Sequence, residues 1–419
     1  MNPLRSRPAL VALGATALLA ATTAVPSAAA TPTRSAAAPG AVALDWYDTT
    51  AETIAAAGAT TQVTNSRTWA ISWLAAARAT RAVPPGVDRG DYQAAALASA
   101  VHDGLVALAP ARTEQLDAAL QQTLDAIPDG ESEDKGVAAG ARQAALALKS
   151  REGDGLDPAS VNAPYPVPAP APGEWQPTPP AYAPATQYGN RLAKPFALTS
   201  ADQYRLPAPP SLDSRRYKTD LAEVRTYGAQ DSTRRTAHQT ETADFWLGSS
   251  LALYTEPLRV AVDRAPRSDA ERAELVALFH VALVDTQIAT SDSKYAYTRW
   301  RPVTAIRTGS IAQDPDWTPL HTTPAHPDYP SGHTTYSGAA EGVLNALAGP
   351  STAPFELTSP TALGVTRTYT SWHELTAENV DARVYSGIHT RSADEAGVTL
   401  GRNVAGQTLR TADRLLRAL

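Results

Sequence analysis

Proline is concentrated in one stretch of the chain, and this stretch limits what the chain can fold into. Residues 157–210 hold 14 of the 34 prolines. Proline lacks an amide hydrogen and its ring clashes with the preceding helical turn, so neither a long helix nor a central strand fits there. On both sides alanine dominates, and runs rich in valine or isoleucine are hard to find, which favours helices.

Five aromatic residues are interspersed among these prolines. They are Trp175, Tyr182, Tyr188, Phe196 and Tyr204. A flexible linker is one interpretation of the composition. Aromatics at this density favour instead an extended strap that packs over helices. We therefore predict an all-α fold of helical bundles with a proline-rich extended strap. Its parts are a signal peptide at 1–30, an N-terminal helical region at 31–156, the strap at 157–210 and a C-terminal helical bundle at 211–419.

Several local patterns indicate individual helices. Leu116, Leu120, Leu124 and Ile127 recur at the spacing of one helical face. Ser268-Asp-Ala-Glu271 and Ser392-Ala-Asp-Glu395 have the form of a capping box, which opens a helix. After the second box, Gly397, Gly401 and Ala405 have the spacing for close helix packing. Residues 314–330 and 350–372 are expected to be loops.

The N-terminus has the features of a secretory signal. Arg5 and Arg7 precede the uncharged stretch Ala9–Val25, and Ala28–Ala30 offers a cleavage site. The alternative is a membrane anchor, but the stretch is short and rich in Ala and Thr. No later segment is expected to be long and apolar enough to span a bilayer, so we predict a secreted protein. Cleavage would make the net charge more negative than −6, which argues against nucleic acid and anionic membranes as partners.

Sulfur is almost absent from the chain, which has no cysteine and has Met1 as its one methionine. The fold must rest on packing, because no disulfide can form. Compositional bias is the simpler explanation. The alternative is resistance to oxidation, because thiols and thioethers are the side chains most easily oxidised.

Three short segments in the last third of the chain combine cations with histidines and a Ser-Gly turn. In the first, Lys294 and Arg301 are seven residues apart on a stretch with a helical pattern. Two turns would place them on one face, about 10 Å apart along the axis. Pro302 disfavours helical geometry at Arg301 and ends or kinks the helix. A solvated pair is the ordinary interpretation, but the neighbours Tyr295 and Trp300 favour partly buried cations that need an anion.

The second segment is Pro330-Ser331-Gly332-His333, just ahead of a helical pattern. A helix that begins here would direct free backbone N–H groups and its positive dipole end into the turn. Ser331 adds a hydroxyl donor, and Gly332 lets an anion approach the backbone. His333 can act as an acid or a base near neutral pH. Taken alone, this segment is an ordinary helix-capping turn.

The third segment carries Arg383 and, six residues later, His389. Arg383 can bind an oxyanion through two N–H groups. His389 can act as nucleophile or ligand through one ring nitrogen when a partner holds the other. Taken alone, this histidine is a polar residue at a helix start. Asp285 and Asp292 share a helical face near Lys294 and are either partners of these cations or the cap of a buried polar patch.

In this order, the segments resemble the signature of the vanadium-dependent haloperoxidases and type 2 phosphatidic acid phosphatases. That signature is Lys, six residues, Arg-Pro; then Pro-Ser-Gly-His; then Arg, five residues, His. Here 27 residues separate the first segment from the second, and 49 separate the second from the third. Trp175–Pro180, Pro195–Leu198 and Arg301–Arg307 are also similar to the secreted bacterial haloperoxidase-type branch.

The chain departs from this pattern at two positions. Ala382 stands where the family usually has Ser, and Ala393 stands where it often has Asp, with Asp394 one position further on. The resemblance therefore does not identify the residue that orients His389.

The resemblance implies a role for each motif residue. The equatorial oxygens of the oxyanion would be held by Lys294, Arg301, Arg383, Ser331 and the amide of Gly332. His389 would be the apical ligand to vanadium, or the nucleophile toward phosphorus, and His333 would be the acid–base group. His326 lies at a position that is His in bromide-oxidising members, and a loop histidine is the alternative.

Three functions are open to this site. The first is a haloperoxidase with vanadate as its cofactor, which oxidises a halide, bromide favoured, with hydrogen peroxide to hypohalous acid. The second is a secreted acid phosphatase that forms a phospho-histidine and needs no cofactor. The third is a non-catalytic anion-binding protein, against which the two histidines argue. The expected partners are peroxide, halide and an organic acceptor, without nucleic acid or a membrane span, and a homodimer is one option for assembly.

Overall fold

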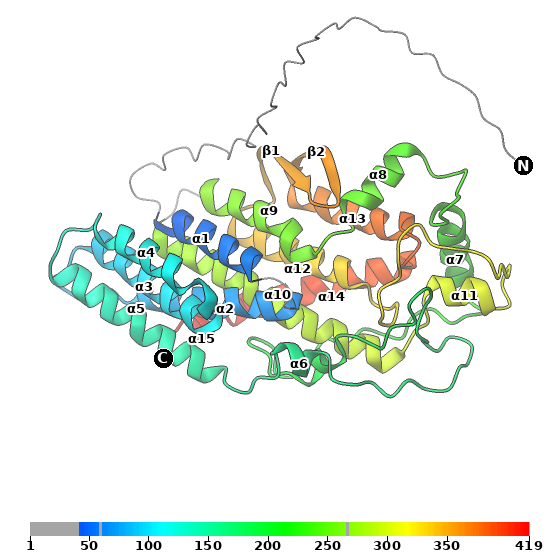
Figure 1. Cartoon of the computed structure of the whole chain (residues 1–419), viewed down its shortest axis with the longest axis horizontal. Helices are drawn as coiled ribbons and strands as arrows, with labels where there is room; N and C mark the ends of the chain where they lie inside the picture. Colours follow the sequence, from blue (N-terminus) through cyan, green and yellow to red (C-terminus); the bar gives the residue numbers. More distant parts are fainter. Residues whose placement is uncertain (1–41, 58–60, 265–267, 419) are drawn as a thin grey trace, which may run out of the picture. The chain divides into compact units, whose positions relative to one another are not determined.

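The protein is described by a computed structural model over residues 42–57, 61–264 and 268–418 (Figure 1). The predicted signal peptide at 1–30 lies outside the described residues. The N-terminal helices are α1 (Val42–Ala56), α2 (Gln62–Arg81), α3 (Arg89–Leu108), the 3-10 helix η1 (Pro110–Arg112), α4 (Thr113–Leu124) and α5 (Glu131–Ser150). The strap contains the short helices α6 (Pro158–Val161) and η2 (Tyr188–Leu192).

The C-terminal part is helical apart from one β-hairpin. Its elements are α7 (Arg215–Tyr227), α8 (Ala237–Phe245), α9 (Ser250–Arg264), α10 (Asp269–Tyr297), α11 (Pro302–Thr308), α12 (Gly332–Leu347), β1 (Ser351–Ser359), β2 (Ala362–Ser371), α13 (Trp372–Tyr385), α14 (Arg391–Arg410) and α15 (Ala412–Leu415). The prediction of an all-α fold of helical bundles with a proline-rich strap is confirmed, with the hairpin as an addition.

Helix α10 lies between the N-terminal helices and the C-terminal bundle (Figure 1). Both hydrogen bonds of the predicted capping box at Ser268 are present at its start. Leu275, Phe279 and Leu283 are buried because α2 packs against α10 on one side and α12 and α14 on another. By length and hydropathy α10 could cross a membrane, so the prediction that no later segment qualifies is wrong. Within its most apolar window, 89% is buried inside the protein, as in a core helix.

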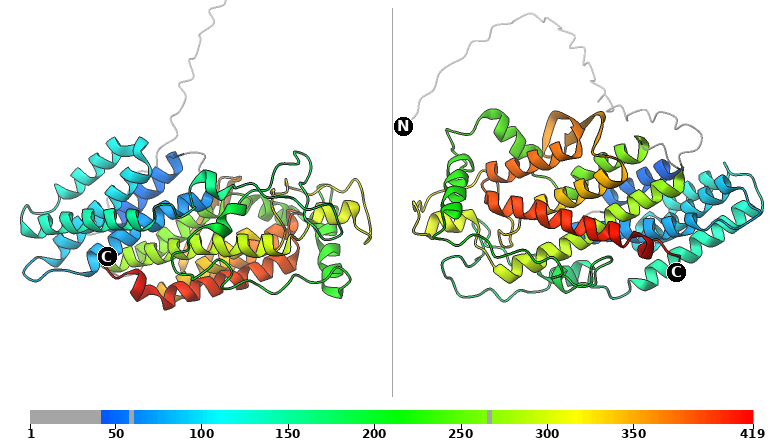
Figure 2. Two further views of the ribbon diagram at one scale, coloured as in Figure 1. Left: turned by 90° about the horizontal axis from the view of Figure 1, so that it is seen from below. Right: turned by 180° about the vertical axis from the view of Figure 1, so that it is seen from behind.

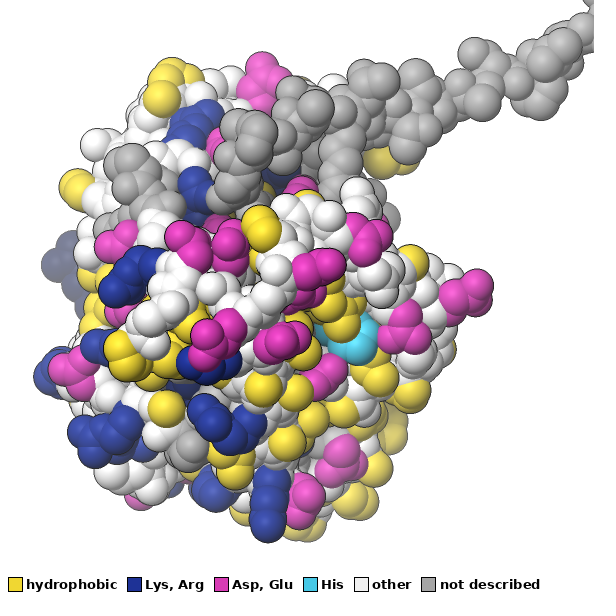
Figure 3. Space-filling view, turned by 90° about the vertical axis from the view of Figure 1, so that its left-hand side faces the viewer, with side chains coloured by type: hydrophobic (Ala, Val, Ile, Leu, Met, Phe, Trp, Pro, Cys, Tyr) yellow, Lys and Arg dark blue, Asp and Glu magenta, His cyan; other side chains and the backbone are white. Residues whose placement is uncertain are grey.

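The N-terminal helices pack closely because small residues face one another. A Cβ atom at Gly136 of α5 would lie 2.6 Å from the carbonyl oxygen of Tyr92, and one at Gly140 would lie 2.6 Å from that of Ala96. On the outside of this end of the protein, acidic and basic side chains are interspersed (Figure 3). One exposed pair joins Lys135 Nζ to Glu131 Oε1 at 2.6 Å.

The strap runs alongside α10 and is held there by two carboxylates of that helix (Figure 2). Asp285 accepts hydrogen bonds of 2.7–2.8 Å from three consecutive backbone N–H groups, those of residues 196–198. Asp292 forms ion pairs with Arg191 at 3.2 Å and Arg205 at 2.7 Å. The alternative that these aspartates are partners of the motif cations is therefore wrong, because their oxygens bind the strap.

The predicted loop at 350–372 is wrong, because residues 351–371 form an antiparallel hairpin. Phe355 pairs with Tyr369, both rings are buried, and the Phe355 ring lies 5.6 Å from that of Trp372. Buried and exposed residues alternate from Phe355 to Ser359, which is the two-residue period of a strand with one buried face. That period was present in the sequence but spans only five residues.

The close packing predicted for Gly397 and Gly401 is confirmed. A Cβ atom at Gly401 would lie 2.1 Å from the carbonyl oxygen of Thr335, so α14 and α12 touch backbone to backbone. At Gly397 the same atom would lie 2.7 Å from the carbonyl oxygen of Ser331. Helix α14 therefore sets the position of the N-terminus of α12.

A buried histidine in α10 generates a prediction about acid stability. The His280 ring stacks on Trp69, with centroids 4.5 Å apart, and among the described residues neither ring nitrogen has a hydrogen-bond partner. Burial lowers the pKa of His280 from 6.5 to about 3. Between these values the unfolded chain takes up a proton that the native state does not, so stability falls by about 1.4 kcal/mol per pH unit as the pH falls.

We expect His280→Phe to gain stability relative to the wild type, and to gain more at pH 4.5 than at pH 8. The free energy of unfolding is measured with urea. Phe keeps the stacking and removes the titrating group. The control is His238→Phe, because the His238 side chain is 71% exposed. An equal gain in stability at both pH values would show that His280 does not cause the loss of stability in acid.

Candidate oxyanion site

The chain leaves the helical conformation between Lys294 and Arg301. Helix α10 ends at Tyr297, Thr298 has a left-handed backbone with φ of 46°, and Arg301 is extended at φ −78° and ψ 157°. The prediction that the two cations share one helical face is wrong. The expected effect of Pro302 is confirmed, because it is the first residue of α11 and the preceding residue is not helical.

Lys294 and Arg301 nevertheless bind the same loop, just before α12. Lys294 Nζ donates to the carbonyl oxygens of Pro327 at 2.6 Å and Asp328 at 3.2 Å. Arg301 Nε donates to the carbonyl oxygen of His326 at 2.6 Å. Both side chains are almost completely buried. Burial and the charge of Arg301 hold the pKa of Lys294 well below its usual value.

The Arg301 guanidinium also binds two histidines. Its Nη1 donates to the carbonyl oxygen of Ile388 at 2.7 Å and lies 3.0 Å from His389 Nε2. Its Nη2 lies 2.9 Å from His326 Nδ1. A guanidinium can only donate, so each of these ring nitrogens accepts. Arg301 therefore connects the first motif with the loop before the second and with the third.

His389 is oriented by a carboxylate that the sequence did not identify. Its Nδ1 lies 2.6 Å from Asp328 Oδ1, and the Thr390 hydroxyl donates to Asp328 Oδ2 at 2.8 Å. Because Asp328 accepts the proton on Nδ1, the lone pair of His389 is on Nε2. Burial, Arg301 and Lys294 hold the pKa of His389 well below its usual value, so the ring is neutral. Burial raises the pKa of Asp328 to about 6, and Arg301 opposes that shift.

The signal for Asp328 was a single acidic residue in the loop between His326 and Pro330. Its function depends on the fold, because its partner is 61 residues further along the chain. The sequence alone could not show that Asp328 contacts His389.

The second motif forms the N-terminus of α12. The Ser331 amide donates to the carbonyl oxygen of Ala393 at 2.9 Å, which fixes the backbone. The buried Ser331 hydroxyl has no hydrogen-bond partner in the part of the chain that the structure describes. A Cβ atom at Gly332, the first residue of the helix, would meet nothing within 4 Å. Open space therefore lies beside N–H groups that no helical carbonyl satisfies.

Arg383 and His333 both bind the loop that joins α8 to α9. Arg383, near the end of α13, donates from Nη1 to the carbonyl oxygen of Trp246 at 3.0 Å, and its buried Nε has no hydrogen-bond partner within residues 42–57, 61–264 and 268–418. His333 Nε2 donates to the carbonyl oxygen of Gly248 at 3.0 Å. Burial, and then the charge of Arg383, lower the pKa of His333 to about 3. The imidazole is therefore neutral at neutral pH.

The hairpin turn holds this loop in place. The Ser359 hydroxyl donates to the carbonyl oxygen of Phe245 at 2.6 Å, and that of Thr361 to the carbonyl oxygen of Asp244 at 2.7 Å. His321 bridges two residues: its Nε2 lies 2.9 Å from Asp244 Oδ1, and its Nδ1 lies 3.0 Å from Ser386 Oγ. The segment 244–248 is thereby fixed relative to both Arg383 and His333.

The start of α14 differs from the prediction. The helix begins at Arg391 after Thr390, so the predicted capping box at Ser392 is wrong. The Thr390 hydroxyl binds Asp328, and the Ser392 amide donates to Asp220 Oδ2 at 3.2 Å. One turn into the helix, Asp394 is fully buried beside the cations, and no described residue forms a hydrogen bond to either of its carboxyl oxygens. Burial raises its pKa well above the usual value, the nearby Ser331 hydroxyl opposes this shift, and the charge of Asp328 adds to it. Protonation of this carboxyl, which the raised pKa favours, lessens its repulsion of an anion.

The structure brings all the motif residues together around this loop and helix start. They are Lys294, Arg301, His326, Ser331, Gly332, His333, Arg383 and His389. Donors without a hydrogen-bond partner among the described residues include the Ser331 hydroxyl, the Arg383 Nε–H and the Gly332 amide. Together with the open space at Gly332, this set fits a small tetrahedral oxyanion such as vanadate or phosphate.

Comparison with known proteins gives a consistent picture. The family described as the VCPO second helical-bundle domain matches residues 274–418, which contain all three motifs. This match and the relatives below support a relationship of the chain to the vanadium haloperoxidase superfamily. It is 27% identical to the vanadium chloroperoxidase of Curvularia inaequalis, a match that covers 49% of this chain and 45% of that protein. It therefore spans less than half the length of that relative.

Two solved structures share the fold over most of the chain. One is a bacterial vanadium-dependent iodoperoxidase, with a TM-score of 0.72, 23% identity, and coverage of 88% of this chain and 96% of the other. The second is an apo-type bacterial vanadium-dependent chloroperoxidase, with a TM-score of 0.66, 15% identity, and coverage of 92% and 96%. The fold shared with these two structures thus includes the N-terminal helices and the strap.

The contact between Asp328 and His389 generates a prediction. We expect Asp328→Asn to weaken orthovanadate binding about 10–100-fold, the usual effect of removing a group that orients a ligating histidine. Calorimetric titration with orthovanadate measures the affinity, and 15N chemical shifts of the histidines report whether His389 keeps its proton on Nδ1. The control is Asp292→Asn, which removes a buried carboxylate that binds the strap. Equal loss in both variants would mean that Asp328 supports only the fold.

Proposed function

We propose that the protein is a vanadium-dependent haloperoxidase that oxidises a halide, bromide favoured, with hydrogen peroxide. One observation carries the proposal: His389 is neutral, with its proton held by Asp328 and its Nε2 lone pair free of protein protons other than those of Arg301. That is the state required of a histidine that ligates vanadium. The proposal includes secretion through residues 1–30 and vanadate as the cofactor.

The residues around His389 would bind the oxyanion and transfer protons. Arg383 Nε, the Ser331 hydroxyl and the Gly332 amide would hold oxygens of the oxyanion, with Lys294 and Arg301 supplying charge. Bound vanadate would supply a pentavalent Lewis acid that activates peroxide. The negative charge of the anion would oppose the effect of Arg383 on His333 and so raise the pKa of that imidazole. His333 can then take and give a proton at Nδ1, because its Nε2–H is held by the carbonyl oxygen of Gly248.

A phosphatase is the second candidate, because the same His389 Nε2 lone pair suits attack on phosphorus. The cations would stabilise the transition state, and His333 would protonate the leaving group. The experiment assays the purified protein with and without orthovanadate, for peroxide-dependent bromination and for hydrolysis of an aryl phosphate. We expect bromination that requires vanadate. Phosphate-ester hydrolysis that vanadate inhibits, without bromination, would favour the phosphatase.

Substitutions of His389 and of His333 should differ in their effects on vanadate affinity and on turnover. We expect His389→Ala to lose tight vanadate binding, because an apical ligand contributes directly to affinity. We expect His333→Ala to retain the anion and to lose about 10²–10⁴-fold in turnover, as is usual for an acid–base group. Affinity is measured by calorimetry and turnover by bromination at saturating vanadate. Equal loss of affinity in both variants would contradict these roles.

Halide preference should depend on His326. Because its Nδ1 accepts from Arg301, this buried neutral ring carries its proton on Nε2. We expect the wild type to oxidise iodide and bromide but chloride poorly, and His326→Phe to change the chloride-to-bromide ratio. Both are measured at matched pH, with His373→Phe, at a histidine whose side chain is 67% exposed, as the control. Efficient chlorination by the wild type would contradict the preference.

A further inference from the structure

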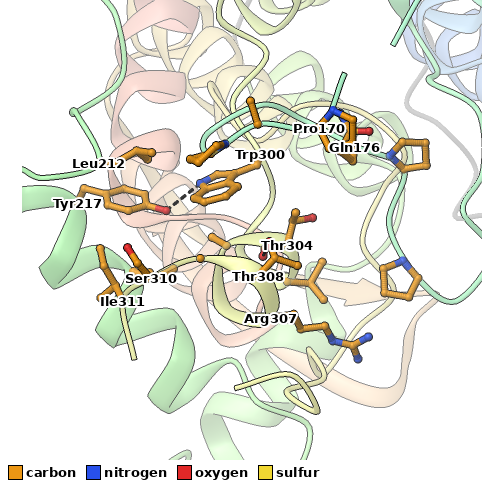
Figure 4. Close-up of a pocket in the computed structure, with 18 of the residues that line it drawn as sticks. Pro170, Gln176, Leu212, Tyr217, Trp300, Thr304, Arg307, Thr308, Ser310 and Ile311 are labelled. Atoms are coloured by element: carbon orange, nitrogen blue, oxygen red, sulfur yellow. Dashed lines mark hydrogen bonds between the residues drawn. The ribbon is translucent and has the colours of Figure 1, made fainter. Parts of the chain in front are cut away.

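A cavity of about 600 Å³ lies between the strap and α11, and the proposed function does not use it (Figure 4). One wall is formed by strap prolines, including Pro170, Pro177 and Pro179. The lining also includes Trp300, Val303 and Ile311. Its size lies within the range of about 300–1,000 Å³ that is usual for sites of small organic ligands. Because Arg301 is extended, Trp300 and Arg301 point to opposite sides of the backbone, so the cavity and the oxyanion site are separate.

The lining is suited to a flat apolar molecule. Trp300 Nε1 donates to the Tyr217 hydroxyl at 2.8 Å, which fixes both aromatic rings at the cavity (Figure 4). Burial raises the pKa of Tyr217 to about 12, so its phenol stays neutral. Arg307 is the one charged residue among those that line the cavity, and its guanidinium already binds the Trp317 carbonyl oxygen and the Thr318 hydroxyl. Charge therefore contributes little to recognition here.

A strained and exposed aromatic residue lies at the edge of the cavity. Tyr182 is 63% exposed, although it lines the cavity, and its backbone is left-handed with φ of 48°. Its amide donates to the Thr178 carbonyl oxygen at 2.9 Å, which holds that conformation. A non-glycine residue in this region costs energy and is common at ligand sites. A large apolar ring left in water gains from a ligand that covers it.

We propose that this cavity binds a planar, neutral and mainly apolar aromatic molecule, which packs between Trp300 and the strap prolines and is covered at the mouth by Tyr182. This binding does not rest on the proposed function, because it involves neither the oxyanion nor peroxide.

The test uses N-phenyl-1-naphthylamine, a neutral flat probe whose fluorescence rises in apolar surroundings, titrated into the full protein without vanadate. We expect saturable binding at one site. Tyr182→Ser should weaken it about tenfold, through lost apolar burial. Thr304→Trp, which fills the cavity from α11, should abolish it.

Leu192→Ser is the matched control, because Leu192 is a strap residue that is 68% exposed and does not line the cavity. It should bind the probe as the wild type does. Circular dichroism checks that each variant is folded. The absence of saturable binding in the wild type would overturn the proposal. So would equal affinity in the wild type, Tyr182→Ser and Thr304→Trp. Neither result depends on whether the protein oxidises halides.

Discussion

Three basic side chains are buried together, and much of the C-terminal structure offsets their mutual repulsion. Lys294, Arg301 and Arg383 are each no more than 1% exposed. Burial lowers the pKa of both arginines to about 10, which measures the cost of keeping their charges out of water. Backbone carbonyl groups of residues 246, 326, 327, 328 and 388 share those charges through hydrogen bonds. An oxyanion would supply the remaining compensation.

The peripheral elements hold in place the carbonyl groups that the buried cations require. A carbonyl can stabilise a cation only if its segment is held rigidly. The hairpin turn binds residues 244 and 245, and so holds the carbonyl groups that Arg383 and His333 need. The strap, bound through Asp285 and Asp292, covers α10, which carries Lys294. Helix α14 holds Ser331 through Ala393 and the close approach at Gly397.

Patterns that act locally could be predicted from the sequence, and contacts between distant segments could not. The capping box at Ser268 and the small-residue spacing at Gly397 involve neighbours in the chain or a single helix face. At Thr390 the local rule failed, because a hydroxyl that could cap α14 binds Asp328 instead. The helical reading of Lys294 to Arg301 failed at Thr298, whose left-handed backbone has no strong local signal. The motif residues could be identified, but Asp328 depends on a contact that only the fold creates.

The bond from Arg301 to His389 determines which kinds of ion the site can accept. A lone histidine with a free Nε2 would ordinarily attract divalent transition metals. Here a guanidinium covers that nitrogen at 3.0 Å, and two further cations lie nearby, so an incoming zinc or copper ion meets like charge. An anion meets the opposite field and can replace the guanidinium as the partner of His389. The site therefore discriminates between ions by the sign of their charge. In the presence of zinc or copper ions, His389 is protected from binding the wrong ion.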